Sequence, residues 1–457
     1  MNPEFSALIR KYNVPGPRYT SYPTVPYWER TPTEQEWLAA LRHELDAHRD
    51  VAGHGAAVYV HVPFCRSLCT YCGCNVRITR NRAIALPYLE AVLAEWKLYV
   101  EGLGRERLPV AEIHFGGGTP TFLNAPELEF VVRGLLDRAD VTPGAEFSVE
   151  ADPRVTNEEQ LRALSQLGFT RLSLGIQDFD PRVQEIVNRV QSEEQVRVLT
   201  EQARALGFTS INYDLIYGLP LQTLESIEQT LAAVRRLKPD RIAFYAYAHV
   251  PWIKPSQRRF TEADLPTGDA KRALYERGRD ILEAEGYREI GMDHFALESD
   301  SLWQASVKGE LHRNFMGYTS RRVSPLIGLG VSSIGDAWTA FAQNEKAIEP
   351  YQERVQKGEL PILRGHVLDD EDLALRSHIL ALMTQFHTEW QQGAPVDYLD
   401  AVPGKLKELQ ADDLVRLNSQ GCEVTERGRA FIRNVCMAFD ARLARRAPDT
   451  QLFSKTV

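Results

Sequence analysis

Six short runs of β-branched and aromatic residues alternate with amphipathic stretches between residues 57 and 247, and this alternation limits the possible folds more than any other feature. The predicted strands span Val58–Val62, Ala111–Phe115, Glu146–Glu150, Arg171–Ile176, Ser210–Ile216 and Arg241–Tyr247. The predicted helices between them span Pro87–Val100, Glu127–Arg138, Glu158–Leu167, Glu193–Leu206 and Leu224–Leu237. Strand and helix units in series form parallel sheets with helical crossovers. We therefore expect an α/β protein, built on an open sheet or on a full or partial barrel.

A polar or glycine-containing motif follows each predicted strand. The motifs are the cysteine-rich stretch after residue 62, GGGTPT at 116–121, EADP at 150–153, GIQD at 175–178, DLIYG at 214–218 and YAH at 247–249. In parallel β/α barrels the carboxyl ends of the strands share one mouth, and active sites lie there. Six motifs in this position favour a barrel-like fold with a single cavity.

The cysteine-rich stretch places Cys65, Cys69, Cys72 and Cys74 within ten residues. A C-x₃-C-x₂-C spacing lets three thiolates reach one face of an iron–sulfur cube, because each loop residue spans at most about 3.5 Å. A cube of four irons then keeps one iron open to a substrate or cofactor. A structural zinc site is less favoured, because no second pair of ligands follows the loop. Disulfides are disfavoured by the low cysteine content and by the lack of a secretory signal at the start.

The other cysteines carry weaker signals. Cys74 is consistent with a spare thiol, a structural residue or a marker of one family. Cys422 and Cys436 lie among apolar and helix-forming residues, where a buried, inert thiol is expected.

Composition and charge exclude several classes of partner. No apolar run approaches the roughly 18 to 20 residues that cross a bilayer, so no membrane partner is expected. The formal net charge of −9 argues against nucleic acid. An anionic substrate remains compatible with this charge, because a few local arginines can bind carboxylates. The cytoplasm is the expected location, since its reducing conditions suit thiolate ligands.

The first fifty residues are predicted to be an extension of the barrel. The segment GPRYTSYP at 16–23 cannot form the interior of a helix, because proline lacks the amide hydrogen. Its tyrosines bury large areas, so we expect it to lie against the body of the protein. A helix is predicted from Thr33 to about His48, with Thr33 as its cap and Glu36 three residues on.

The strand-end motifs also offer binding groups. Three glycines at 116–118 allow close approach of a ligand and present amide groups, although a plain turn is the alternative. Glu150 and Asp214 can accept hydrogen bonds from an ammonium group or from ribose hydroxyls, although such residues are often helix caps or surface partners. Gln177 adds a side chain that can both donate and accept hydrogen bonds, and Arg189 adds a permanent positive charge.

Together these motifs resemble the radical S-adenosylmethionine (SAM) enzymes and, more narrowly, the oxygen-independent coproporphyrinogen III oxidase family. The resemblance covers nearly the whole chain. It also includes GPRYTSYPT at 16–24, CGCN at 72–75, GMDHFA at 291–296, LHRNFMGYT at 311–319 and RGRAFIRNVCMAFD at 427–440. It implies a partial (β/α)6 barrel of the radical SAM type at 51–360, with an N-terminal extension at 1–50 and a small, mostly helical C-terminal domain at 361–457.

The resemblance also implies a mechanism. Cys65, Cys69 and Cys72 would hold a 4Fe-4S cluster whose open iron binds the amino and carboxylate groups of SAM. One electron would cleave the sulfonium, and the resulting 5′-deoxyadenosyl radical would abstract hydrogen from the β-carbon of a propionate. Loss of carbon dioxide and a further electron leaves a vinyl group. Two such steps convert coproporphyrinogen III to protoporphyrinogen IX in haem synthesis. No catalytic side chain is assigned, because the radical forms at the cluster and SAM.

The family's cofactor contacts, carried onto this sequence, fall at Tyr59, Tyr71, Gly117, Gly118, Thr119, Glu150, Gln177, Arg189, Asp214, Ala248 and Ile334. The family is associated with a second SAM molecule, and Ile334 would lie on that side. Arg18, His312 and Arg313 are candidate partners of the substrate carboxylates by motif position only. The resemblance further implies a monomer and a one-electron donor such as flavodoxin or ferredoxin.

Two other functions share this core. One is a haem chaperone that binds haem without decarboxylase activity, and the other is a different radical SAM enzyme that acts on haem or transfers a methyl group. The GPRYTSYPT extension and Cys74 favour the oxidase over the chaperone. The GMDHFA segment and the N-terminal extension weigh against the second alternative.

Overall fold

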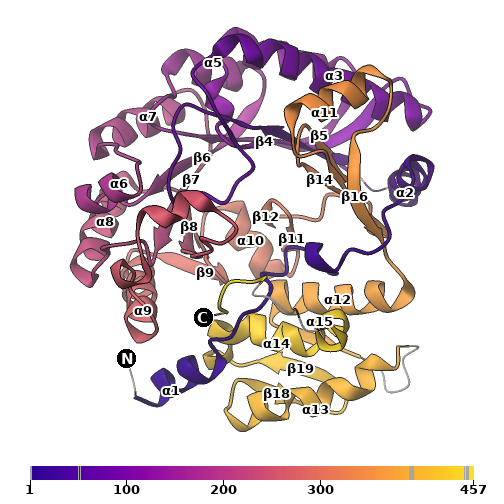
Figure 1. Cartoon of the computed structure of the whole chain (residues 1–457). Helices are drawn as coiled ribbons and strands as arrows, with labels where there is room; N and C mark the ends of the chain where they lie inside the picture. The colour runs from indigo at the N-terminus through magenta and orange to yellow at the C-terminus, as the bar shows by residue number, and fades with distance from the viewer. Residues whose placement is uncertain are drawn as a thin grey trace.

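The six predicted strands form the centre of one large sheet (Figure 1). The computed structural model describes residues 3–49, 51, 53–390, 396–446, 448 and 452–456. Neighbouring central strands run parallel. In spatial order they are β1 (Ala56–Val62), β4 (Leu108–Gly117), β5 (Ala139–Ala151), β6 (Phe169–Gln177), β7 (Ser210–Tyr217) and β8 (Arg241–Ala246). The partial barrel expected from the sequence is confirmed.

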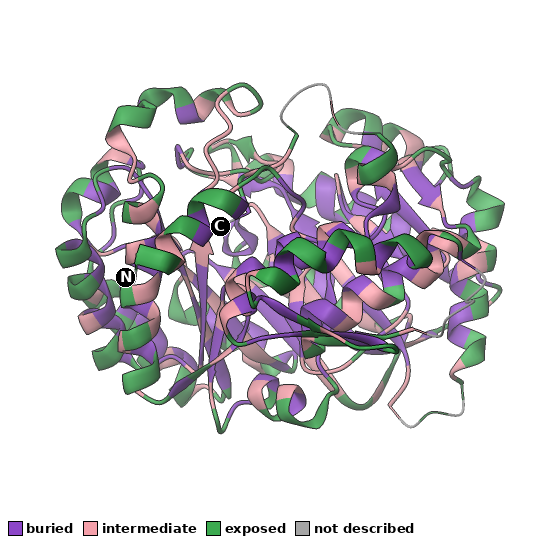
Figure 2. Cartoon of the chain, turned by 90° about the horizontal axis from the view of Figure 1, so that it is seen from below, coloured by how far each residue is buried: buried purple, intermediate pink, exposed green. Residues whose placement is uncertain are grey.

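Helices cover the outside of this sheet and bury its outer face, as in other parallel β/α barrels. Figure 2 shows the buried strands inside and exposed helix faces around them. All the predicted helices of the barrel are confirmed, with ends that differ by at most two residues. Gly168 and Gly207 follow two of them in left-handed conformations, with φ of 93° and 96°, as their places after the last helical turn indicate. The helices that match the prediction are α3 (Ala85–Gly102), α4 (Ala125–Leu136), α5 (Glu158–Gln166), α7 (Glu193–Ala205) and α8 (Leu224–Leu237). The structure adds α6 (Pro181–Ile186) and α9 (Asp269–Ala284).

Shorter strands extend the sheet on both sides. Beside β1 lie β13 (Leu326–Leu329), β14 (Ile334–Asp336), β15 (Ala340–Asn344) and β16 (Ile362–Val367). Beside β8 lie β10 (His294–Leu297) and β9 (Tyr287–Gly291). β13 is parallel to β1, whereas the others pair in antiparallel fashion. β16 begins just after residue 360, where the sequence suggests a domain boundary, and still pairs with β15.

Smaller elements connect these parts. They are β2 (Phe64–Cys65), β3 (Arg77–Ile78), α10 (Ser301–Lys308), β11 (His312–Asn314), β12 (Gly317–Thr319) and α11 (Ile348–Gln356). No helix in the described ranges is long and apolar enough to span a bilayer.

The C-terminal part is mostly helical and also contains a small antiparallel sheet in the order β17, β19, β18. These strands have three or four residues each, too few for a clear alternation in the sequence. The elements are α12 (Asp370–Gln385), β17 (His387–Glu389), α13 (Tyr398–Ala411), β18 (Val415–Leu417), β19 (Gly421–Val424), α14 (Ile432–Ala438) and α15 (Ala441–Arg445).

The N-terminal extension packs against both larger parts. The predicted helix is α2 (Glu34–Ala47), and Thr33 and Glu36 form the expected capping box at its start. A further helix, α1 (Pro3–Tyr12), lies outside the predicted elements. Its apolar side, together with Tyr19 and Tyr22, belongs to the hydrophobic core of the C-terminal domain. The tyrosine-rich segment is therefore buried, as its composition indicates.

Arg433 of α14 fixes the two ends of the chain beside each other. Its Nε donates to the Pro17 carbonyl at 2.8 Å, and its Nη1 donates to the Lys455 carbonyl at 2.8 Å. Its Nη2 also donates to the carbonyl of Gly16. The backbone amide of Thr456 donates to the Val14 carbonyl at 2.8 Å. One buried guanidinium thus links the N-terminal segment to the C-terminal tail.

Glu95 of α3 is the centre of a buried network that holds the loop between β13 and β14. Its carboxylate accepts hydrogen bonds from Gly330 N (2.8 Å), Asn344 Nδ2 (2.6 Å) and Tyr351 Oη (2.6 Å). Burial raises the pKa of Glu95 to about 7, although these donors oppose the shift. The network positions the loop that leads to Ile334.

We predict that Glu95 makes stability depend on pH. Because its pKa is higher in the folded protein than its ordinary 4.5, its contribution is full below about pH 4.5 and is lost as the pH rises through about 7. Between pH 5 and 8 the wild type should lose up to roughly 3 kcal/mol more stability than Glu95→Gln, measured by urea unfolding. Parallel losses in both proteins would contradict this assignment.

Candidate active site

The cysteine loop follows β1 and is fixed at both ends. Its first and last residues pair as the parallel strands β2 and β3. The amide of Arg77 donates to the Pro63 carbonyl at 2.7 Å, and that of Thr79 donates to the Cys65 carbonyl at 2.9 Å. The loop therefore starts and ends at the same point of the barrel mouth.

Other strand-end segments hold the middle of the loop. Asn188 Nδ2 donates to the Leu68 carbonyl at 2.7 Å. Gln257 Nε2 donates to the Tyr71 carbonyl at 3.1 Å and to the Ala248 carbonyl at 3.2 Å. The segments after β6 and β8 thus support the loop, as expected if the strand ends share one mouth.

Each of the three predicted ligand thiols has a polar neighbour. Cys65 Sγ lies 3.3 Å from Thr119 Oγ1. Cys69 Sγ accepts from two guanidinium groups at 3.6 Å each. Cys72 Sγ accepts from the backbone amide of Cys74 at 3.4 Å. Burial raises the pKa of Cys65 to about 11, whereas hydrogen bonds from the Cys74 thiol and then from the Cys74 backbone amide lower that of Cys72 to about 6.

The thiols fit a multi-iron cluster better than a single metal ion. Within the described ranges, no three His, Cys, Asp or Glu side chains are grouped closely enough to hold one ion. A structural zinc site requires four ligands that converge on one point. A cluster places each thiolate on a different iron and takes hydrogen bonds at its sulfurs. Thiols held by one loop, each with its own polar neighbour, match the second arrangement.

Arg189 and Arg154 connect Cys69 to the barrel. Arg189 is 7% exposed, and its Nη2 donates to the Gly175 carbonyl of β6 at 2.6 Å. Its Nη1 lies 3.2 Å from Asp152 Oδ2, directly after β5. Arg154 Nη2 donates to the same oxygen at 2.6 Å. The two cations keep the pKa of the buried Asp152 below its ordinary value, so the carboxylate stays charged.

The three glycines lie where backbone segments approach closely. Gly117 has φ of 109°, a conformation that disfavours other residues, and its amide donates to Glu150 Oε2 at 3.1 Å. The Gly118 amide donates to the Val62 carbonyl at 2.8 Å. Thr119, next in the chain, contacts Cys65. This motif thus joins the cysteine loop to Glu150.

His114 contacts both Tyr59 and Glu150 and so links these two residues. The rings of Tyr59 and His114 are stacked, with centroids 5.8 Å apart. His114 Nε2 lies 3.4 Å from Glu150 Oε1. The Glu150 side chain is still 42% exposed, so one of the predicted acceptors remains accessible.

Asp214 is the second carboxylate of this region. It accepts hydrogen bonds from Asn212 Nδ2 (2.9 Å) and Ser173 Oγ (3.1 Å). Burial and the negative charge of Glu150 raise the pKa of Asp214 to about 7. Two neighbouring carboxylates suit a cationic ligand.

The remaining predicted residues lie around this centre. Tyr71 belongs to a small apolar cluster with Val187 and Tyr247. Gln177 ends β6 in a left-handed conformation, with φ of 69°. Ile334 begins β14, and its backbone packs against Gly328, the partner of Tyr59 in the sheet. These positions surround the barrel mouth but share no hydrogen bond with the cysteines in the described structure.

Two of the three candidate substrate residues, Arg18 and Arg313, are in contact, whereas His312 lies apart from them. Arg18 forms an ion pair with Asp293. Arg313 stacks on Tyr318 at 4.5 Å and donates to the Arg18 carbonyl at 3.5 Å. His312 precedes Arg313 on β11 and lines a separate cavity of about 580 Å³ beside α12, because successive strand residues face opposite sides.

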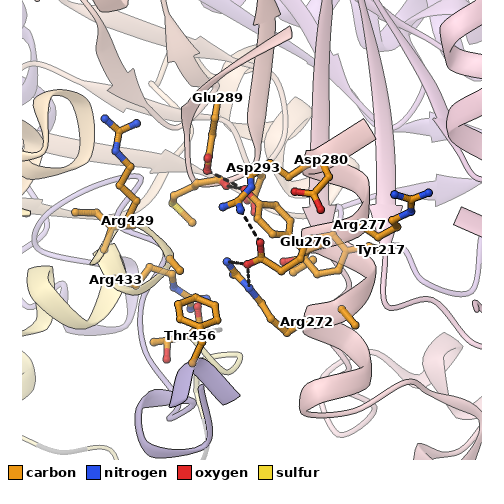
Figure 3. Close-up of a pocket in the computed structure, with 18 of the residues that line it drawn as sticks. Tyr217, Arg272, Glu276, Arg277, Asp280, Glu289, Asp293, Arg429, Arg433 and Thr456 are labelled. Carbon is orange, nitrogen blue, oxygen red and sulfur yellow. Dashed lines mark hydrogen bonds and ion pairs between the residues drawn. The ribbon is translucent and has the colours of Figure 1, made fainter. Parts of the chain in front are cut away.

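A cavity of about 780 Å³ opens between α9, the N-terminal segment and the C-terminal domain (Figure 3). Its lining includes Arg18, Tyr217 and Asp293. Arg272 and Arg279 also line it, and both are ion-paired with Glu276. Its volume lies within the range that holds a drug-sized ligand.

Several polar residues of the site carry no clear signal in the sequence. Asp152 belongs to the EADP motif, but its bond to Arg189 joins residues 37 apart in the chain. His114 and Tyr245 lie inside apolar strands, where a buried ring is the ordinary expectation. Only the alternation of strand residues places His114 on the same face as Tyr59 and Glu150.

Comparisons with known proteins agree with this geometry. Residues 59–234 match the family model described as the radical SAM superfamily. The chain is 40% identical over 459 residues to the oxygen-independent coproporphyrinogen III oxidase of Pseudomonas aeruginosa, with 98% of each chain covered. It is 40% identical over 464 residues to the Escherichia coli protein of that name, covering 99% of this chain and 98% of the relative. The solved coproporphyrinogen III oxidase from Escherichia coli, described as a radical SAM enzyme, matches with a TM-score of 0.86 and 39% identity over 95% of this chain and 98% of that chain.

We predict different costs for adding a methyl group at two glycines of this region. A Cβ at Gly118 would lie 2.8 Å from the carbonyl carbon of Pro63 and 2.9 Å from its oxygen, and these backbone atoms cannot move aside. Gly118→Ala should therefore lower stability by about 1–3 kcal/mol in chemical denaturation. Gly73 has no atom within 4 Å of such a Cβ, so Gly73→Ala is the control, with an expected change within about 0.5 kcal/mol. Equal effects would contradict the close packing at Gly118.

Proposed function

The chain belongs to the oxygen-independent coproporphyrinogen III oxidases of the radical SAM superfamily, and from this premise we propose how its residues perform the reaction. The activity is the oxidative decarboxylation of coproporphyrinogen III propionates in haem biosynthesis. The superfamily implies a 4Fe-4S cluster and SAM as cofactors. When bound, these cofactors supply the radical that removes hydrogen from the substrate.

The observation that supports this function best is the environment of the three thiols. Cys65, Cys69 and Cys72 would hold the cluster through one loop fixed at both ends. Arg154 and Arg189 would stabilise the negative charge of the Cys69 thiolate, since both donate to its sulfur. Asp152 would keep these guanidinium groups in place, because it accepts bonds from both.

We assign the predicted cofactor contacts around this cluster to SAM. Gly117 and Gly118 would let the backbone approach the ligand, and Glu150 and Asp214 would accept hydrogen bonds from its ammonium group or ribose hydroxyls. Tyr59, Tyr71, Thr119, Gln177, Arg189 and Ala248 would complete the contacts. We propose that two SAM molecules bind, and that Ile334, across β13 from Tyr59, lies on the side of the second. The buried strands and helices would exclude water from the reacting groups.

We also propose that the three parts of the chain act as one unit. Residues 1–50 would contribute Arg18 to the active site, residues 51–360 would carry the chemistry, and residues 361–457 would close the cavity beside the N-terminal segment. We propose a cytoplasmic monomer, in keeping with the reducing conditions that thiolate ligands need.

We predict that the reaction requires each of the three ligand thiols. After anaerobic reconstitution, Cys65→Ala, Cys69→Ala and Cys72→Ala should each bind far less iron than the roughly four atoms of the wild type. With a chemical reductant, SAM and coproporphyrinogen III, they should yield neither 5′-deoxyadenosine nor vinyl product. Cys422→Ala, which removes a buried thiol of the C-terminal domain, is the matched control and should still yield both 5′-deoxyadenosine and vinyl product. Deoxyadenosine without porphyrin conversion in the wild type would reject this substrate.

A group of cations beside the cysteine loop suggests how the electron arrives. Lys254 Nζ donates to the Cys74 carbonyl at 3.3 Å, and Asn75 Nδ2 donates to the Lys346 carbonyl at 2.8 Å. Burial and the positive charges of Arg364 and Lys254 lower the pKa of Lys346. None of these three cations has a carboxylate partner among the described residues. On a chain with net charge −9, this local excess fits an acidic partner.

Exposed apolar side chains lie next to these cations. Trp252 is 49% exposed and Ile253 is 52% exposed, and both precede Lys254 directly. Aromatic anchors with a charged rim are typical of protein interfaces. We therefore propose that an acidic one-electron carrier of the flavodoxin or ferredoxin kind docks over Lys254 and Lys346.

We predict that reversing these charges slows only the carrier-dependent reaction. The double variant Lys254→Glu/Lys346→Glu should reduce turnover with a reduced acidic carrier at least tenfold at low salt, because attraction becomes repulsion. Turnover with dithionite should change less than twofold, since this small reductant needs no docking surface. The double variant Lys405→Glu/Lys407→Glu, at two exposed lysines on α13 of the C-terminal domain, is the charge-matched control. An equal loss with both reductants would contradict the docking site.

A further inference from the structure

We propose that Arg313, with Arg18 beside it, binds a propionate carboxylate of the tetrapyrrole that stays intact while another propionate reacts. This inference rests on the proposed substrate, and it assigns a binding residue to it. It is carried by the unpaired polar atoms of Arg313, by the charge around them and by their place between the cofactor residues and the large cavity.

Arg313 is a buried cation without an anionic partner. The residue is 8% exposed, and its Nε and Nη1 have no hydrogen-bond partner among the residues described. Its Nη2 makes one long bond, 3.5 Å to the Arg18 carbonyl. Its guanidinium lies over the Tyr318 ring, which compensates only part of the lost hydration. Buried guanidinium groups normally bind a carboxylate, because unpaired donors are costly away from water.

The surroundings leave an excess positive charge. Arg18 is already ion-paired with Asp293. His294 lies on the same side, and burial together with the charge of Arg313 lowers its pKa to about 3, so it stays neutral. The Nδ1 of His294 also lacks a hydrogen-bond partner in the described structure. Asp293 thus pairs with only one of these two guanidinium groups, and a substrate carboxylate would supply the partner that Arg313 lacks among the described residues.

Tyr245 of β8 connects this cluster to the cofactor side of the barrel. Burial and the charges of Asp214 and Asp293 raise its pKa, and the charges of Arg18 and Arg313 oppose that shift. Arg18 lies over the Tyr245 ring at 5.9 Å, and the register of β7 and β8 puts Tyr245 on the same face of the sheet as Asp214, one of the predicted SAM contacts. A substrate propionate bound to Arg313 would therefore hold the tetrapyrrole ring on the opposite side of Tyr245 from the cofactor.

The cavity provides room for the rest of the substrate. Arg18 and Asp293 line its inner end beside Tyr217, whereas Arg277 and Glu283 on α9 are exposed at its rim. Figure 3 shows Asp293 and Tyr217 facing the same space. Arg313 does not line this cavity but donates to the backbone carbonyl of Arg18, which does, so a propionate of the ring would extend past Arg18 to reach it.

The energetics favour a carboxylate that is not lost. An ion pair with the reacting carboxylate would stabilise the ground state and would have to break as carbon dioxide leaves. An ion pair with a second propionate costs nothing in the transition state and orients the ring. Coproporphyrinogen III has four propionates, so at least two remain available at every stage.

The test is a binding measurement on the reconstituted full-length protein. Fluorescence titration with coproporphyrin III, the stable oxidised ring, should show Arg313→Leu binding about 10- to 100-fold more weakly than the wild type, as expected for loss of charge-assisted hydrogen bonds. Arg313→Lys should recover part of the affinity, because it keeps the charge but not the two-pronged geometry. The tetramethyl ester of coproporphyrin III should bind the wild type and Arg313→Leu equally, since it offers no carboxylate.

Two further measurements separate binding from a structural role. Arg313→Leu should not lower the thermal unfolding temperature, because it removes an uncompensated buried charge. In turnover, KM for coproporphyrinogen III should rise by about the same factor as Kd, with a smaller change in kcat. Arg288→Leu, which removes an arginine of β9 paired with Glu298, is the control and should leave coproporphyrin III affinity unchanged.

The outcomes distinguish this inference from the proposed function. Unchanged affinity of Arg313→Leu for coproporphyrin III, or an equal loss for the ester, would overturn the carboxylate site. A lower unfolding temperature with unchanged Kd would assign Arg313 a structural role and would also overturn it. If wild type binds coproporphyrin III through Arg313 but does not convert coproporphyrinogen III, the proposed function fails while the carboxylate site stands.

Discussion

The buried guanidinium of Arg189 lies where three separate parts of the active site meet. It donates to the end of β6, pairs with Asp152 after β5 and contacts Cys69 in the loop after β1. Each of these segments is at the carboxyl end of a parallel strand, so the sheet brings them together without a long connection. Breaking such a pair leaves an uncompensated charge in the interior. The position of the cysteine loop therefore depends on the order of the strands, and the order of the strands depends on the helices that cover them.

Much of this architecture could be predicted from the sequence, because it follows from local patterns. The helix after Thr223 and the capping box at Thr33 are found where composition places them. Gly168 and Gly207, which each follow the last turn of a helix, adopt the left-handed conformation that this position predicts. The flanking strands β14 to β16 and the helix α1 are not among the predicted elements, because each is short or depends on a surface supplied by distant residues.

In the candidate site, too, some residues could be predicted from the sequence and others could not. The cysteines, the glycines at 116–118 and Glu150 lie in motifs that are compact in sequence. The partners that position them are far away in the chain, as with Arg189 and Cys69, which are 120 residues apart. The unpaired state of Arg313 is invisible in a sequence, since an arginine on a short strand ordinarily finds a carboxylate. Such properties arise only when tertiary contacts decide which charges meet.

The interior of the barrel carries opposite charges at its two sides. Glu150 and Asp214 lie near the carboxyl ends of β5 and β7, whereas Arg18 and Arg313 contact each other at the N-terminal segment, with Arg18 over the Tyr245 ring. A cationic cofactor and an anionic substrate would thus be drawn to different sides of one cavity. The same separation disfavours either ligand in the other's place, which is specificity by repulsion as well as by attraction.

The bonds of Arg433 have a consequence for how the protein is made. The segment that carries Arg18 is held by a guanidinium more than 400 residues later and by backbone groups at 454–456. On the ribosome this N-terminal segment emerges first, but the bonds from Arg433 and from residues 454–456 can form only when nearly all of the chain has been synthesised. The cluster loop and the strands around it can fold much earlier. Maturation therefore has a built-in order, in which the iron-binding half is formed while the wall that would confine a radical is still missing.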